Sequence, residues 1–228
     1  QAYDNEREVG EGLRASGVRR DAVFVTTKIW PTHFAPHELE RSAKESLARL
    51  RLGEVDLLLL HWPNPQVPLA ETLGALVRVK QAGLARHIGV SNFTVALIEE
   101  AVAAAGEPLV CDQIEYHPYL DQSKVIEACR RHGMTPVAYS PVAKGRVKSD
   151  QALERIGACY GKSAAQVCLR WLAQQDIPAI PRTSRIERLS ENIDIFDFTL
   201  DDDEMRQIFA MGSAKGRLVD VAFAPKWD

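Results

Sequence analysis

Two hydrophobic patterns alternate along this chain from Arg20 onward. Short apolar runs typical of buried strands occur near residues 22–27, 55–60, 86–90, 108–114, 135–139 and 177–181. Between them, apolar residues recur every three or four positions, which predicts amphipathic helices near 4–16, 36–50, 69–82, 94–105, 122–132, 150–175, 185–193 and 201–211. Strands that alternate with helices in this way indicate a parallel sheet with crossover helices.

The number of β–α units favours a barrel of which this chain holds a part. No Gly- or Pro-rich linker divides the chain, so we expect one domain over residues 1–228. A closed (β/α)8 TIM barrel has eight units, and about six are visible. An open, doubly wound sheet is the alternative, but no G-x-G-x-x-G motif follows a strand, as that fold usually requires.

Composition narrows the class of protein further. The 228 residues are 46% hydrophobic with a net charge of only -3, which favours a soluble globular protein without nucleic-acid or membrane partners. No signal peptide opens the chain and no apolar run reaches membrane-spanning length, so we expect a cytoplasmic location. The four cysteines are scattered, and His33 and His37 lack a third ligand, so no metal site is predicted.

Three residues that can handle protons stand where predicted strands end. Lys28 closes the run 23–28 and His61 closes the run 55–61, while Tyr3 lies in a segment that reads as the loop after a strand. The carboxyl ends of the strands in an α/β barrel share one mouth, so these side chains should converge. Taken singly, they could be a surface tyrosine, a solvated lysine and a core histidine. Taken together, they predict proton transfer to an oxygen atom.

Seven short stretches extend this pattern over nearly the whole chain. The order and spacing of these stretches resemble those of the aldo-keto reductase family, and in particular of the small bacterial reductases similar to diketogulonate reductases. The stretches are Tyr3-Asp4-Asn5-Glu6, Thr27-Lys28-Ile29-Trp30, Leu60-His61-Trp62-Pro63, Gly89-Val90-Ser91-Asn92-Phe93, Gln113-Ile114-Glu115-Tyr116-His117-Pro118, Tyr139-Ser140-Pro141, and Ile180-Pro181-Arg182-Thr183 with Arg188, Glu191 and Asn192.

The resemblance implies a (β/α)8 barrel that binds a nicotinamide cofactor without a Rossmann motif. It also implies a catalytic tetrad of Asp, Tyr, Lys and His, in which Tyr3, Lys28 and His61 take three places. The Asp would lie five residues before Tyr3, ahead of Gln1. We therefore expect roughly two further β–α units, about 50 residues at typical barrel spacing, to precede residue 1.

The resemblance assigns the nicotinamide end of the cofactor to residues at three strand ends. Ser91, Asn92 and Gln113 would hold the carboxamide, and Tyr139 would stack on the ring. Ser140 and the turn that follows it, through Gly145, would line the path of the pyrophosphate. Outside this reading, Tyr139 could be a core tyrosine and Gln113 could cap the sheet.

A cationic and hydroxylic cluster near the last predicted strand favours NADP(H) over NAD(H). Arg182, Thr183 and Arg188 could form charge-assisted hydrogen bonds with the additional ribose phosphate that only NADP(H) carries. The family usually has Lys-Ser where this chain has Arg182-Thr183, a change that keeps both charge and hydroxyl. Glu191 and Asn192 would contact the adenine end, or else lie on a solvated helix face.

The substrate pocket is expected to be apolar and fairly open. Trp30 and Trp62 lie beside the catalytic residues, Phe93 and Trp227 could add to the walls, and residues 212–228 would fold over the mouth. We therefore predict a monomeric, NADPH-dependent reductase of small aldehydes, ketones or keto acids. The alternatives are a non-catalytic nicotinamide-binding regulatory protein of the same fold and, less favoured, a phosphate-binding barrel isomerase.

Overall fold

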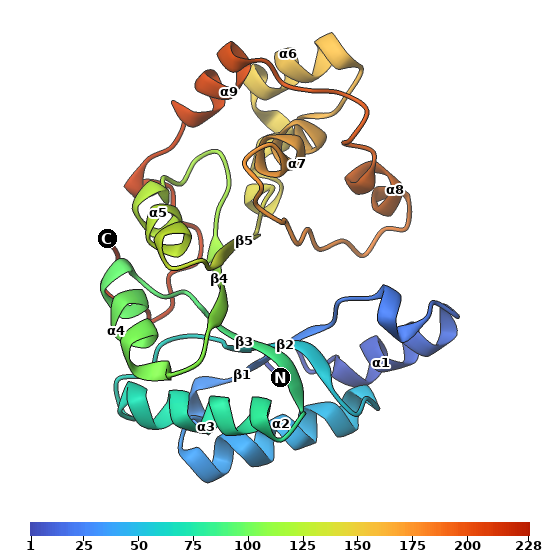
Figure 1. Cartoon of the computed structure of the whole chain (residues 1–228). Coiled ribbons are helices and arrows are strands. Elements are labelled where there is room, and N and C mark those ends of the chain that lie inside the picture. The colour runs from blue at the N-terminus through green and yellow to red at the C-terminus, as the bar shows by residue number, and fades with distance from the viewer. The chain divides into compact units, whose positions relative to one another are not determined.

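The computed structural model describes residues 1–228 and divides them into two compact units (Figure 1). The first unit comprises residues 1–112, 128–134 and 223–228, and the second comprises residues 113–127 and 135–222. Strand β4 (Leu109–Glu115) and helix α5 (Ser123–Arg131) each continue from one unit into the other. The prediction of a single domain stays a prediction.

The first unit alternates helices and parallel strands, as the hydrophobic pattern predicts. Strands β1, β2 and β3 pair in parallel, with Lys28 opposite Leu59 and Leu58 opposite Ile88. Helices that follow one another in this part of the chain also pack side by side (Figure 1). Its elements are α1 (Glu6–Ala15), β1 (Thr26–Ile29), α2 (Pro36–Leu50), β2 (Val55–Leu60), α3 (Leu69–Gln81), β3 (Ala85–Ser91) and α4 (Val95–Ala105), with short 3₁₀ turns at Arg20–Ala22 and Pro31–His33.

Close backbone contacts in the first unit require glycine at two positions. A side chain at Gly10 would place its Cβ 2.2 Å from the carbonyl oxygen of Leu50, so α1 packs directly against the end of α2. A Cβ at Gly89 would lie 2.6 Å from the carbonyl oxygen of Cys111. Both distances are shorter than any van der Waals contact, so these glycines set how closely neighbouring elements approach.

The second unit is mainly helical. Its core forms around Trp171, whose ring lies 5.0 Å from that of Tyr116 and 5.2 Å from that of Phe209, measured between centroids. Its elements are β5 (Thr135–Tyr139), a 3₁₀ segment at Ala143–Ser149, α6 (Gln151–Tyr160), α7 (Ala164–Ala173), α8 (Glu187–Ile193), α9 (Asp202–Phe209) and a 3₁₀ turn at Ala214–Gly216.

Hydrogen bonds place the strands of the sheet in the order β1-β2-β3-β4-β5, which is also their order in the sequence. Neighbouring parallel strands in sequence order are what successive β–α units produce. None of the helices is both long and apolar enough to cross a membrane.

One predicted strand is almost lost in the structure, and one predicted helix is divided. The predicted strand 177–181 is reduced to one bridge between Ala138 and Ala179, because Pro178 and Pro181 have no N–H for a longer ladder. The predicted helix 150–175 is two helices, α6 and α7. Gly161, in a left-handed conformation (φ 67°), ends the first, and a capping box at Ser163 begins the second.

The first predicted strand is also displaced, from residues 22–27 to Thr26–Ile29. A 3₁₀ turn at Arg20–Ala22 precedes it. The main-chain N–H of Val25 donates to the buried carboxylate of Asp56 at 2.7 Å instead of to a main-chain carbonyl. A side-chain oxygen on β2 thus takes the place of a main-chain acceptor between strands. The hydrophobic pattern does not predict such a contact.

Candidate active site

Tyr3, Lys28 and His61 come together in the first unit. Lys28 lies on β1, and His61 directly follows β2, where its N–H donates to the carbonyl of Ile29 at 3.0 Å. The Nζ of Lys28 is 5.7 Å from the centroid of the Tyr3 ring, and the Tyr3 and His61 ring centroids are 6.0 Å apart. The structure thus assembles the three proton-handling side chains that the strand ends predict.

Burial determines the charge of the two nitrogen bases at this site. It lowers the pKa of Lys28 to about 8. Burial, together with the nearby positive charge of Lys28, lowers the pKa of His61 to about 3. His61 is therefore a neutral imidazole at physiological pH, and its Nδ1 is buried without a hydrogen-bond partner.

Tyr3 differs from the other two because its side chain is 61% exposed. It lies in the turn that leads into α1, where Asp4 has a positive φ of 47° and its N–H donates to the carbonyl of Gln1 at 3.2 Å. An exposed phenol beside a half-buried ammonium and a buried imidazole can be reached by a small molecule from solvent.

Aromatic rings surround this group. The Trp30 ring meets the imidazole of His61 edge-on at 5.1 Å, and it also meets Phe223 at 5.8 Å. Trp62 contacts Phe223 at 5.9 Å and Trp227 at 6.1 Å, all measured between centroids. The rings of Phe223 and Trp227 thus lie against Trp62, and the predicted place of Trp227 in the substrate pocket stays a prediction. Phe223 was missed, because nothing but its proximity to Trp227 in the sequence marks it.

Ser91 ends strand β3, Asn92 directly follows it, and both are buried. Asn92 has a left-handed backbone (φ 64°), and its Nδ2 donates to the carbonyl of His61 at 3.0 Å and to the Ser91 hydroxyl at 3.1 Å. This amide side chain is thus fixed against the backbone of a proposed catalytic residue. Phe93 is almost fully buried, so its predicted place in the substrate pocket stays a prediction.

In the second unit, three more of the predicted cofactor residues lie in or directly after a strand. Gln113 is buried in β4, and Tyr139 ends β5, where its carbonyl accepts from the Tyr116 N–H at 3.3 Å. Ser140 follows in a left-handed conformation (φ 51°), and Lys144 in the next loop has a φ of 54°. These turns carry donors and acceptors of the kind that the cofactor prediction requires.

The predicted phosphate-binding residues occupy a loop and helix α8. Arg182 is exposed and Arg188 is half-buried in the first turn of α8, and neither guanidinium pairs with a carboxylate. The Thr183 hydroxyl bridges the main chain of Arg185, accepting from its N–H at 3.1 Å. Glu191 accepts a hydrogen bond from the Ser163 hydroxyl at 2.7 Å, and Asn192 lies next to it, half-buried. Two cations are therefore available here for an anionic ligand.

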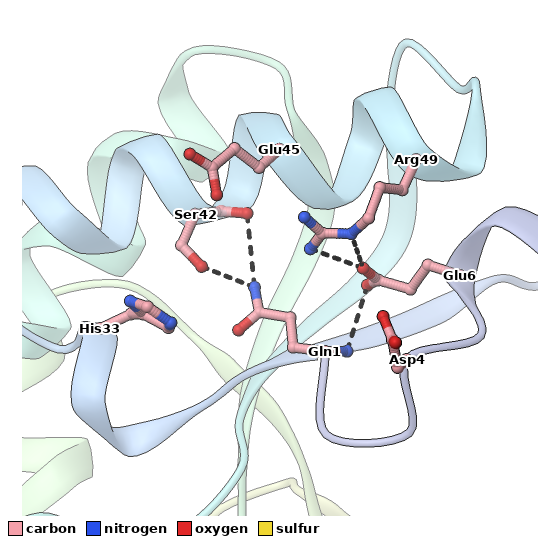
Figure 2. A pocket seen from close by; sticks show the side chains of 7 residues that line it. All are labelled: Gln1, Asp4, Glu6, His33, Ser42, Glu45 and Arg49. Atoms are coloured by element: carbon pink, nitrogen blue, oxygen red, sulfur yellow. Dashed lines mark hydrogen bonds and ion pairs between the residues drawn. The ribbon is translucent and has the colours of Figure 1, made fainter.

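A small polar pocket of about 220 Å³ lies beside the turn that carries Tyr3 (Figure 2). Within it, Glu6 contacts Arg49, and the Gln1 side chain reaches the Ser42 hydroxyl. Prediction from the sequence did not give Glu6 a role, although it belongs to the first matching stretch. The pocket is lined by Gln1, Asp4, Glu6, His33, Ser42, Glu45 and Arg49.

Comparison with known proteins identifies the class. A model of the aldo/keto reductase family matches residues 1–212. The chain is 38% identical over 231 residues to methylglyoxal reductase DkgB of Escherichia coli O157:H7, which covers 100% of this chain and 86% of the relative. It is also 38% identical over 222 residues to morphine 6-dehydrogenase of Pseudomonas putida, covering 91% of this chain and 75% of the relative.

Two solved structures of reductases are also similar to this chain. The crystal structure of a putative 2,5-diketo-D-gluconic acid reductase B matches with a TM-score of 0.98 and 47% identity, covering 100% of this chain and 82% of the other. An aldo-keto reductase of Bombyx mori, in complex with NADP, matches with a TM-score of 0.90 and 32% identity, covering 97% and 79%.

This chain belongs to the aldo/keto reductase family. Membership confirms the predicted family, its likeness to the bacterial diketogulonate reductases and the (β/α)8 barrel class. It also confirms the predicted enzyme class, an oxidoreductase that uses NADP(H). The roles of individual residues remain predictions.

Proposed function

We propose that this protein reduces aldehydes or ketones to alcohols, with Tyr3 as the proton donor and Lys28 and His61 as its assistants. The observation that carries this proposal is the convergence of a phenol, an ammonium and a neutral imidazole where β1 and β2 end. Reduction of a carbonyl adds a hydride to carbon and a proton to oxygen. NADPH, when bound, supplies the hydride.

Tyr3 and Lys28 act together on the proton. A tyrosine with an ordinary pKa of about 10 is a weak acid at neutral pH. A nearby ammonium stabilises the phenolate that remains after the proton leaves, which makes the transfer easier. The Nζ of Lys28 lies close enough to the Tyr3 ring to exert this effect.

His61 acts as a neutral hydrogen-bond donor. Because its pKa is lowered to about 3, its imidazole does not compete with Lys28 for charge and does not repel it. A neutral ring N–H aimed at the carbonyl oxygen would orient that oxygen toward Tyr3 and stabilise the developing charge. Burial among Trp30 and Trp62 excludes water from this donor.

We expect the cofactor to be held by residues whose chemistry suits its two ends. Ser91, Asn92 and Gln113 offer amide and hydroxyl groups that complement a carboxamide, and Tyr139 offers a ring for stacking. Arg182 and Arg188 have no carboxylate partner and can take up the ribose phosphate, with Thr183 as a further donor. Ser140 would face the pyrophosphate, and Glu191 and Asn192 the adenine end.

Small carbonyl compounds are the proposed substrates. The relatives are named for the reduction of methylglyoxal and of a diketogluconic acid, and one for dehydrogenation of morphine. Trp30, Trp62 and Trp227 would wall the pocket, and Phe93 could add to them. That the protein acts as a monomer in the cytoplasm is also a proposal, carried over from the sequence.

Steady-state assays of NADPH consumption test this function. We expect turnover of small aldehydes and keto acids, with one alcohol formed for each NADPH consumed. The non-catalytic alternative predicts NADPH binding without turnover of any carbonyl in the panel. Relatives named as reductases and dehydrogenases support the enzyme over that alternative.

A further inference from the structure

Glu6 is a buried carboxylate three residues after Tyr3, at the start of α1. Two side chains donate to it at short distance. The Thr27 hydroxyl donates to Oε1 at 2.6 Å. Nε of Arg49 donates to Oε2 at 2.7 Å, a contact between Arg49 and Glu6 that Figure 2 shows. The hydroxyl comes from β1, and the guanidinium comes from α2. One carboxylate therefore joins three elements.

The first of these partners connects Glu6 to the proposed catalytic lysine. Thr27 immediately precedes Lys28 on β1, and its side chain is buried on the opposite face of the strand. Through this hydrogen bond, the turn that carries Tyr3 is tied to the strand that carries Lys28. The two residues on which proton transfer is proposed to depend thus share one anchor.

The second partner keeps the carboxylate ionised and fixed. Burial raises the pKa of Glu6, but the hydrogen bonds from Thr27 and Arg49 outweigh it and hold that pKa below its usual value. Arg49 is itself held by a hydrogen bond from Nη2 to the Ser46 hydroxyl at 3.1 Å. The carboxylate has donors on both oxygens, so its orientation is fixed from two sides.

A buried ion pair is weak support for stability, because desolvation offsets most of the attraction. Its directional hydrogen bonds, one on each oxygen of Glu6, nevertheless restrict how α1, β1 and α2 can be placed. Tyr3 is 61% exposed, and its ring lies near the Lys28 ammonium and the His61 imidazole. An anchor three residues away in the chain, joined to the strand of Lys28, further limits where the turn that carries Tyr3 can lie.

We propose that Glu6 is a positioning residue for the proton donor: through Thr27 and Arg49 it holds the Tyr3 turn at a fixed distance from Lys28. This inference rests on the proposed roles of Tyr3 and Lys28. Glu6 does not touch the substrate and exchanges no proton. Its effect is on the rate of the chemical step and not on the affinity for cofactor.

Thr27 offers the sharpest test, because two replacements of similar size separate the hydroxyl from its volume. Thr27→Ser keeps the donor to Glu6 and should keep kcat within about 2-fold of the parent. Thr27→Val removes the donor and should lower kcat by about 10- to 100-fold, the size of loss that small misplacement of a catalytic group produces. Neither variant should change KM or the Kd for NADPH by more than about 3-fold.

Glu6→Gln provides a second, independent variant. It keeps an oxygen that can accept from Thr27 but removes the charge that Arg49 neutralises. We expect a loss of kcat like that of Thr27→Val and a changed pH profile of kcat, because the separation of Tyr3 from the Lys28 ammonium changes. Glu38→Gln is the matched control. It breaks an exposed ion pair with Arg41 on α2, the helix that carries Arg49, and it should change neither kcat nor its pH profile.

Three outcomes decide the matter. Lowered kcat in Thr27→Val with rescue in Thr27→Ser supports the inference. A lower melting temperature with unchanged kcat and unchanged pH profile in Thr27→Val and Glu6→Gln would overturn it and leave Glu6 a purely structural residue. If Tyr3→Phe also retains full turnover, the proposed function fails instead. In a Tyr3→Phe background, Thr27→Val should cause no further loss of the residual rate.

Discussion

At the scale of single residues, burial assigns the charge states in the candidate site. Lys28 and His61 lie in the same partly desolvated region, where two positive charges would repel each other. The lowered pKa of His61 removes that conflict, since the imidazole is neutral and Lys28 is protonated between about pH 3 and about pH 8. The site therefore presents one ammonium and one neutral donor over a wide range of pH.

The charge of Lys28 makes a prediction about pH. Burial lowers its pKa to about 8, so the ammonium proposed to support Tyr3 is lost as the pH rises through that value. We expect kcat/KM for carbonyl reduction to fall above about pH 8. Profiles measured from pH 6 to 10 test this, with Lys28→Arg as the comparison, because guanidinium keeps its charge throughout. A rate that stays level to pH 10 would contradict the assignment.

Asp112 makes a separate prediction, about stability. It is fully buried in β4, where its carboxylate oxygen Oδ1 accepts from the Phe93 N–H at 3.5 Å and Oδ2 has no partner. Burial raises the pKa of this carboxyl to about 8 from a usual 3.8. The folded state thus holds the proton more tightly than the unfolded state. The free energy of unfolding should therefore fall as the pH rises from about 4 to about 8, and then level off.

Asp112→Asn should remove that part of the pH dependence. The amide has nearly the same shape and can still accept from Phe93, but it does not ionise. Chemical denaturation at pH 5, 7 and 9 measures the free energy of unfolding. We expect that of the variant to rise relative to that of the parent as the pH rises. Glu100→Gln, on the exposed side of α4, serves as the control. If the free energies of unfolding of Asp112→Asn and the parent differ by the same amount at all three pH values, Asp112 is not held neutral by burial.

At the scale of elements, the contact of α1 with α2 depends on Gly10. Gly10→Ala would place a methyl group 2.2 Å from the Leu50 carbonyl oxygen and should destabilise the protein by about 1–3 kcal/mol. Gly12→Ala lies on the same helix with no atom within 4 Å, and it should stabilise by about 0.5–1 kcal/mol. Denaturant unfolding measures the change in the free energy of unfolding for each variant. Changes of the same sign and size in Gly10→Ala and Gly12→Ala would contradict the close packing at Gly10.

The elements that hydrophobic periodicity could predict are those with an uninterrupted pattern. The helix at 36–50 and the strands at 55–60 and 135–139 agree with the structure to the residue. Elements near prolines and glycines were harder to place. Pro178 and Pro181 shorten a predicted strand to one bridge, and Gly161 divides a predicted helix, because backbone chemistry there overrides side-chain pattern.

The same limit applies to the candidate site. Tyr3, Lys28 and His61 could be found because strand ends and short motifs mark them. The contact of Glu6 with Arg49 could not, since the two are 43 residues apart and join only when α1 packs on α2. Long-range polar contacts of this kind depend on the fold, and no local pattern of residues encodes them.

At the scale of the whole molecule, each compact unit contains part of the proposed machinery. Tyr3, Lys28, His61 and Asn92 belong to the first unit, and the residues proposed to bind the ribose phosphate belong to the second. Catalysis and cofactor preference should therefore respond to different substitutions.

Arg182→Ala tests this separation. Loss of the guanidinium should weaken NADPH binding by about 10-fold or more, since one charge-assisted contact of about 1.5–3 kcal/mol is removed, while NADH binding changes little. Titration of both cofactors by fluorescence measures it, with Arg185→Ala in the same loop as the control. Equal losses for NADPH and NADH would count against contact with the ribose phosphate.

The most direct measurement is the rate of methylglyoxal reduction by Tyr3→Phe, alongside the Kd of the same variant for NADPH. We expect kcat to fall by about 10²- to 10⁴-fold, as it does on loss of a general acid, while the Kd for NADPH stays within about 2-fold of the parent. Parent-like turnover by Tyr3→Phe, with intact NADPH binding, would contradict Tyr3 as the proton donor.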